Sequence, residues 1–191
     1  HKSSKSQSNT YRVKTLEEIE KELDKSEQKT KSDYSDLIDQ SAQLMKDIEK
    51  LQAQLMQQKD LSWQDKKKLE KLMEQYQQLQ DKLNELQQNE QHKQNLENQY
   101  KNIDEDIIKK QQELQKRMDQ VVSDEMKEML QKLQNMMNNA NKDQVQKEMQ
   151  KLKSNTEEIN KTLDQQLQLY KQLEVEKKLN KAEEKQRKRV T

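Results

Sequence analysis

The sequence predicts an all-α fold: an elongated antiparallel coiled coil of three long helices, in which two helical hairpins share a long central helix. The 191 residues include no Gly or Pro, and strong helix formers dominate the composition. Only 28% of the residues are hydrophobic, against roughly 45–50% in an ordinary globular chain, so no sizeable closed core is expected. Apolar residues recur at alternating steps of three and four from Leu16 to Leu179. This spacing puts a narrow apolar stripe on each helix, which only another helix can bury.

The first helix is predicted over residues 16–59. Thr15 and Glu18 fit a capping box, in which the hydroxyl and the carboxylate satisfy backbone N–H groups at the helix start. Residues 1–14 are polar, and we expect them to form a flexible N-terminal segment ahead of the helical rod.

The central helix is predicted over residues 63–138, about 115 Å long at ~1.5 Å per residue. Ser62 is its expected N-cap. Stripe residues on the two sides of residues 60–62 pair symmetrically, as an antiparallel hairpin requires. Examples of these pairs are Leu51 with Leu72 and Leu44 with Leu79.

Two polar stretches interrupt the apolar stripe, at residues 24–33 and 87–95. They lie at similar distances from the turn at 60–62, so they face each other across the first hairpin. We expect them to form the weak, bending-prone section of the rod. Whether the central helix is continuous through 87–95 and 122–123 is left open.

The third helix is predicted over residues 142–183, after a turn at 139–141, where asparagines tolerate the backbone of a tight turn. Stripe residues pair about this turn as well, for example Leu133 with Met149 and Met129 with Leu152. The rod then spans residues 15–183 and is followed by a basic tail, 184–191. The outer ends of the first and third helices should meet near residues 100–107. The rival architecture is a continuous parallel dimer, roughly 285 Å long.

Missing residue types exclude most functional classes. Without Gly there is no P-loop or dinucleotide-binding turn, because both need a glycine backbone. There is no Cys, and His1 and His92 are the only histidines, so no metal-ligand spacing occurs. Acidic clusters such as residues 104–106 lack the water-restricted pocket that acid–base catalysis needs. We therefore expect no enzymatic activity, no cofactor, no metal and no small-molecule substrate.

Three residues are candidates for contact with a protein partner: Trp63, Met136 and Met137. Trp63, the only tryptophan, falls at the predicted tip of the first hairpin. Its ring either anchors a partner, as aromatic residues often do, or folds over the turn and closes the apolar stripe, which we favour. Met136 and Met137 flank the second turn, and the stripe spacing leaves Met137 as the better candidate for an exposed side chain.

The basic C-terminus offers a second kind of contact. Lys185, Arg187, Lys188 and Arg189 form the densest cationic cluster, and such tracts bind phosphates or lipid headgroups. Cations are equally favoured in the last turns of a helix by its dipole. No apolar run exceeds two residues, so neither a membrane span nor a signal peptide is predicted.

Two strings, LMKDIEKL at residues 44–51 and LSWQDKKKL at residues 61–69, resemble coiled-coil regions of large, uncharacterised, membrane-anchored bacterial envelope proteins. The resemblance covers only a small part of the chain, and SWQDKKK is its most specific string. It implies a periplasmic stalk that belongs to a longer chain, and it implies no catalytic residue.

These observations predict a non-enzymatic structural coiled-coil stalk or scaffold segment of a larger cell-envelope assembly, on the periplasmic side, with a cytoplasmic location left open. Its partners would be other proteins of the assembly or the rest of its own longer chain, and self-association is also open. One alternative is a protein-binding module acting through its hairpin tips. Another is a rod that contacts nucleic acid or lipid through the basic C-terminus. The net charge of +1 disfavours nucleic acid.

Overall fold

The computed structural model describes residues 14–100, 105–121, 124–138 and 141–190. These residues form helices and contain no strand, which confirms the all-α prediction. The helices are α1 (Leu16–Met56), α2 (Trp63–Tyr100), α3 (Glu105–Val121), α4 (Asp124–Asn138) and α5 (Lys142–Val190). The predicted flexible segment 1–14 lies outside the described residues except for its last residue.

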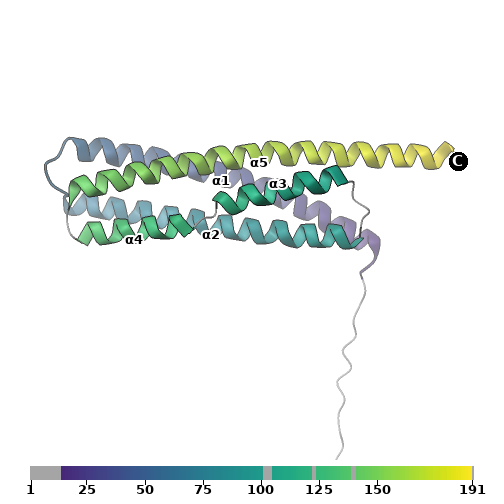
Figure 1. The fold of residues 1–191 in the computed structure, drawn as a ribbon, viewed down its shortest axis with the longest axis horizontal. Coiled ribbons are helices and arrows are strands. Elements are labelled where there is room, and N and C mark those ends of the chain that lie inside the picture. The colour runs from purple at the N-terminus through teal and green to yellow at the C-terminus, as the bar shows by residue number, and fades with distance from the viewer. Residues whose placement is uncertain (1–13, 101–104, 122–123, 139–140, 191) are drawn as a thin grey trace, which may run out of the picture.

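The helices form an elongated antiparallel four-helix bundle, in which α3 and α4 follow one another along one side (Figure 1). Helix α1 packs against α2 and α5, and α4 packs against both α2 and α5. Helix α3 packs against α5. The bundle therefore has four sides, formed by α1, by α2, by α3 with α4, and by α5. Each side packs against two neighbours, and the four surround one shared core.

The predicted continuous helix over residues 63–138 is wrong, because the chain reverses between α2 and α3. Helices α2 and α5 run in the same direction. Tyr76 donates its hydroxyl to Asn155 (2.6 Å), and further along both helices Lys93 donates to Tyr170 (2.6 Å).

Helix α3 runs the opposite way along α5. The Lys110 ammonium contacts Glu176 (2.6 Å), whereas Arg117, later in α3, donates to Gln165 (3.4 Å), earlier in α5. Since α2 is parallel and α3 antiparallel to α5, α2 and α3 are antiparallel to each other. A hydrogen bond from Gln87 to Asp119 joins the two directly.

The physical reason for the reversal is the size of the core that it creates. A two-helix hairpin buries only one narrow stripe per helix, whereas two hairpins folded together bury their stripes in a single core. Leu37, Tyr76, Met126 and Ile159 belong to one buried cluster although they come from four different helices. Full burial of a large apolar side chain stabilises the fold by about 1.5–3 kcal/mol. The free energy gained by burying all the stripes in one core therefore exceeds the cost of an additional turn.

The predicted helix starts are confirmed by their capping contacts. Thr15 and Glu18 form the expected capping box at the start of α1. Ser62 and Asp65 exchange equivalent hydrogen bonds at the start of α2. Asn141 accepts from the backbone N–H of Gln144 (3.2 Å) at the start of α5. These polar caps place the starts of α1, α2 and α5 at Leu16, Trp63 and Lys142, where the sequence predicted them, and the predicted turn residues 139–140 lie outside the described residues.

The first and last helices lie side by side, so the expectation that only their outer ends meet near residues 100–107 is wrong. Asn160 of α5 donates to the Ile38 carbonyl (2.9 Å) and to the Ser41 hydroxyl (2.7 Å) of α1. Nearer the α1–α2 turn, Gln52 donates to Gln150 (3.2 Å). Helix α5 also continues beyond the predicted end at 183 and projects past the other helices (Figure 1).

Candidate functional site

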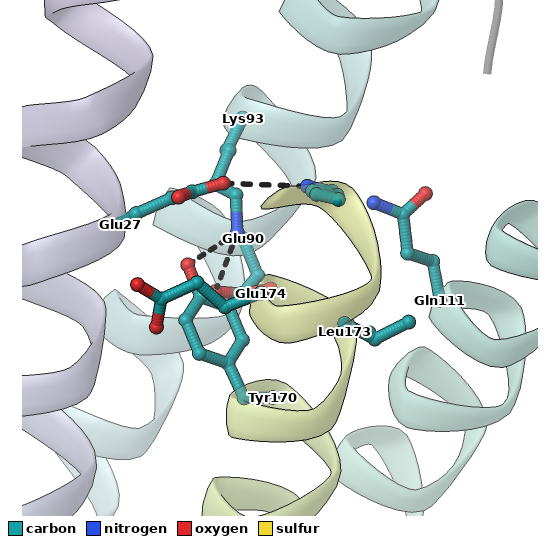
Figure 2. A pocket seen from close by; sticks show the side chains of 8 residues that line it. Glu27, Glu90, Lys93, Gln111, Tyr170, Leu173 and Glu174 are labelled. Atoms are coloured by element: carbon teal, nitrogen blue, oxygen red, sulfur yellow. Dashed lines mark hydrogen bonds and ion pairs between the residues drawn. The ribbon is translucent and has the colours of Figure 1, made fainter. Parts of the chain in front are cut away.

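The two polar stretches that the sequence predicted to be weak contribute to a buried polar cluster. We define this cluster as Glu27 of α1, Glu90 and Lys93 of α2, Gln111 of α3, and Tyr170, Glu174 and Lys177 of α5. Figure 2 shows these side chains, from four helices, converging around a small cavity. Carboxylate, ammonium, amide and phenol side chains thus gather in one region of the bundle.

Lys93 lies at the centre of the polar cluster, and only 3% of its surface is exposed. Its ammonium group donates to the Tyr170 hydroxyl (2.6 Å) and lies 4.2 Å from the centroid of the Tyr170 ring. The carboxylate of Glu90, also buried, is 3.8 Å away. A buried charge is tolerated only when it is paired and hydrogen-bonded, so these contacts hold Lys93 and Glu90 in one arrangement.

Tyr34 of α1 extends the polar cluster into the apolar core. Its ring lies 6.3 Å from the Tyr170 ring, centroid to centroid, at an interplanar angle of 44°. Burial raises the pKa of the Tyr34 phenol above its usual range, and the negative charge of Glu90 raises this pKa further. Tyr34 is therefore held in its neutral form.

Ion pairs surround the polar cluster and connect three of the helices. Glu174 of α5 binds Lys31 of α1, and Lys177 of α5 binds Glu27 of α1 (3.3 Å). On the other side of α5, Glu176 pairs with Lys110 of α3. The helices are thus joined by charged pairs whose partners must match in register.

The cavity inside the polar cluster has a volume of about 10 Å³, which leaves room for roughly one water molecule. A substrate or cofactor needs a pocket of about 300–1,000 Å³. What the arrangement does chemically is fix helix register, because a shift of one helix would leave a buried charge without its partner.

Trp63 lies at the α1–α2 end of the bundle, and its ring is 68% exposed. The interpretation that it folds over the turn and closes the apolar stripe is therefore wrong. Leu55 and Leu69, both fully buried, close that end of the core, and Leu61 packs against them. The ammonium group of Lys67, one helical turn on, lies 4.2 Å from the Trp63 ring centroid. This cation–π contact leaves most of the ring accessible.

Of the two methionines, Met137 differs from its predicted exposure, whereas Met136 was predicted on the apolar stripe. Met137 is only 7% exposed and belongs to the core, so its prediction as a surface contact is wrong. Met136 is partly buried and packs against the same core. The reversal at the end of α2 explains the difference, because it places α4 beside two helices, α2 and α5, instead of one.

The basic C-terminus is helical through Val190. The side chains of Lys185 and Arg187 are exposed on α5, and those of Lys188 and Arg189 lie outside the described residues. The exposed His92 lies in the polar stretch of α2. Among the described residues, no group of three or more His, Cys, Asp or Glu side chains is arranged to hold a metal ion.

No helix in the described part of the chain combines the length and the apolar character that crossing a membrane requires. Comparison of the chain with protein-family models, curated proteins and solved structures finds no match. Two features of this molecule bear on its function: a polar cluster that fixes helix register, and an exposed tryptophan at one end.

Proposed function

We propose that the chain is a non-enzymatic structural segment, a rigid helical stalk or scaffold, within a larger cell-envelope assembly. The observation that carries this proposal is a core that continues along the bundle. Leu55, Leu69 and Val145 are fully buried at one end, and Leu23 and Leu173 are buried toward the other. Toward that second end the polar cluster interrupts the apolar core. Bending of the rod would expose apolar surface and buried charges to water, so the bundle resists it.

Contacts between helices support a stiff rod. Lys153 of α5 pairs with Glu49 of α1 (2.8 Å), and the hydrogen bond and charge of Glu49 raise the pKa of the Lys153 ammonium. A single exposed pair of this kind contributes little, because solvent screens its charges. Several pairs between α1 and α5, together with the buried hydrogen bond from Lys93 of α2 to Tyr170 of α5, favour one helix register over all others.

The proposed partners are other proteins of the assembly or the rest of a longer chain of which this segment is part, and self-association is a further possibility that the test below addresses. The formal net charge of +1 gives no reason to propose nucleic acid. The envelope location rests on the resemblance of residues 44–51 and 61–69 to coiled-coil regions of envelope proteins.

Small-angle scattering combined with light scattering tests the rod. We expect a mass of 23.1 kDa, that of one chain, and a longest helical dimension of about 74 Å, set by the 49 residues of α5. A particle near 115 Å would indicate a continuous central helix instead. A dimer approaching 285 Å would contradict the bundle altogether, and a broad distribution of lengths would contradict a rigid stalk.

A further inference from the structure

The α1–α2 end of the bundle carries exposed apolar side chains among lysines. We define the tip surface as Met56, Lys59, Trp63, Lys66 and Lys67. Met56 is 76% exposed, more than any other large apolar residue that the structure describes, and Trp63 follows it. Both flank the turn at the end of the bundle (Figure 1). Exposed apolar side chains at the end of a rod indicate a contact surface.

The lysines of the tip surface differ from many others on the bundle. Among the described residues, Lys59, Lys66 and Lys67 have no carboxylate within ion-pair distance, whereas lysines along the sides of the bundle, such as Lys153 and Lys177, are paired. Unpaired lysines keep their full positive charge available to an anionic partner.

The acidic residue closest in sequence to Trp63 does not neutralise the tip surface. Asp65 is fully buried. Its carboxylate accepts hydrogen bonds from the Ser62 backbone N–H (2.9 Å), the Ser62 hydroxyl (2.5 Å) and the Gln54 amide (2.6 Å). Asp60 and Asp65 bring two negative charges to the turn, and Lys59, Lys66 and Lys67 bring three positive ones, so the tip surface is net positive.

We propose that the tip surface docks end-on onto an anionic lipid bilayer. Trp63 and Met56 would enter the headgroup region, where tryptophan is favoured, while Lys59, Lys66 and Lys67 contact lipid phosphates. The inference goes beyond the scaffold function and does not depend on it. A bilayer surface supplies anionic and apolar groups together without a fixed shape, which matches a protruding turn. A protein partner would need both an acidic patch and a pocket for the tryptophan ring.

The basic C-terminus is a poorer candidate for lipid contact. It lies at the opposite end of the bundle (Figure 1). Its exposed Lys185 and Arg187 have no aromatic side chain within the last two helical turns, because Tyr170 is buried far from that end. Among the side chains that the structure describes, only the tip surface combines cations with an accessible ring.

The experiment uses Trp63, the single tryptophan of the chain, as its own reporter. The full chain is titrated with phosphatidylcholine vesicles that contain or lack phosphatidylglycerol. We expect a blue shift of tryptophan emission with the anionic vesicles only, and quenching of this emission by brominated anionic lipid. Absence of any shift or co-sedimentation with anionic vesicles would overturn the proposal.

Lysine substitutions decide which end of the bundle makes the contact. The variant Lys66→Gln/Lys67→Gln should weaken vesicle binding by about 25-fold, because each lysine near an anionic membrane contributes roughly a fivefold change in affinity. The matched control Lys181→Gln/Lys185→Gln removes the same charge from the exposed C-terminal part of α5 and should bind as the parent chain does. Loss of binding in the control alone would place the lipid contact at the C-terminus and overturn the proposal.

Substitution of the tryptophan separates a membrane from a protein partner. Trp63→Ala should weaken co-sedimentation with anionic vesicles while helicity stays unchanged, since the ring is mostly exposed. Capture of a protein that depends on Trp63, with no vesicle binding by the parent chain, would overturn the membrane inference. The scaffold proposal would be unaffected by that result, because its own test is the length and mass of the rod.

Discussion

Lys93 is a long cationic side chain placed where the heptad pattern would normally put an apolar one. Its burial removes a charge from water, which costs several kcal/mol unless partners compensate. Tyr170 and Glu90 provide that compensation. Glu90 lies one turn away on the same helix, whereas Tyr170 comes from α5, which lies beside α2 only in the correctly folded bundle. We infer that the polar cluster selects one helix register, at some cost in stability.

Removing the charge of Lys93 alone should therefore be strongly destabilising. The variant Lys93→Met keeps the length of the side chain but leaves Glu90 buried without its positive partner. We expect a loss of about 3–5 kcal/mol in the free energy of unfolding, measured by urea denaturation at neutral pH. The double variant Lys93→Met/Glu90→Gln should recover most of this loss. Equal destabilisation by the single and double variants would show that the ion pair does not carry the effect.

Tyr34 gives a prediction at alkaline pH. Its pKa is raised in the folded state, chiefly by burial, so the folded bundle keeps the phenol protonated while the unfolded chain releases the proton near pH 10. The stabilising contribution is complete below pH 10 and is lost as the pH rises above it. Tyr34→Phe should flatten the decline in stability above pH 10 by up to about 1.4 kcal/mol per pH unit. An identical decline in the variant and the parent would contradict this assignment.

Individual side chains were predictable from the sequence only where local chemistry decides their position. Thr15, Ser62 and Asn141 cap helices through neighbours a few residues away. The sequence predicted the first two as caps and Asn141 as a turn residue. Met137 and Trp63 were predicted wrongly, because the exposure of a side chain depends on which other helices lie beside it. That information is absent from the spacing along one helix.

At the level of helices, the end of α2 is the feature that the sequence concealed. Gly and Pro, the usual signals for a helix end, do not occur in this chain. A start signal was nevertheless present, since Glu105 and Asp106 occupy the first turn of α3, where the helix dipole favours negative charge. We interpreted these acids as part of a solvated helix face, so the reversal was missed.

A disulfide can test this reversal directly, because the chain has no cysteine of its own. Gln87 and Asp119 are hydrogen-bonded in the bundle although they are 32 residues apart in the sequence. On a continuous helix they would be separated by about 48 Å. We expect Gln87→Cys/Asp119→Cys to form an intramolecular disulfide on mild oxidation, detected by gel mobility and thiol titration. A control pair, Gln77→Cys/Asp119→Cys, places the first cysteine ten residues earlier in α2, about 15 Å along the helix from Gln87, and should remain reduced. Failure of the first pair to close would contradict the reversal.

At the scale of the whole molecule, both turns and the two hairpins were predictable, but their association was not. An apolar stripe at alternating steps of three and four suits a two-helix hairpin and a four-helix bundle equally well. The bundle also buries polar residues such as Gln80 and Gln166. Because the stripe was defined by apolar residues alone, it was narrower than the helix surface that is actually buried. The sequence thus defined the class of the fold and the helix starts, and left the number of sides of the bundle undetermined.

The end of α5 should contribute little to the stability of this bundle. Leu179 is exposed, and so are the described side chains that follow it in α5. Removing residues 179–191 should change the free energy of unfolding by less than about 1 kcal/mol, measured by urea denaturation. As a control, removal of residues 167–191 also deletes Tyr170, Leu173 and Lys177 and should prevent stable folding. A large loss from the shorter truncation would show that the projecting part of α5 supports the bundle.

The pairing of the first helix with the last has a consequence for how the protein is made. Lys31 and Glu174 are separated by 143 residues, and Glu27 and Lys177 by 150. During synthesis, α1 and α2 emerge from the ribosome long before α5 exists, and they present an uncovered apolar face in the interval. Contacts between distant parts of a chain also form slowly, because a long loop must close first. The nascent chain is therefore exposed to aggregation until translation is nearly complete, and it is a natural client for a chaperone that binds unfinished helical hairpins.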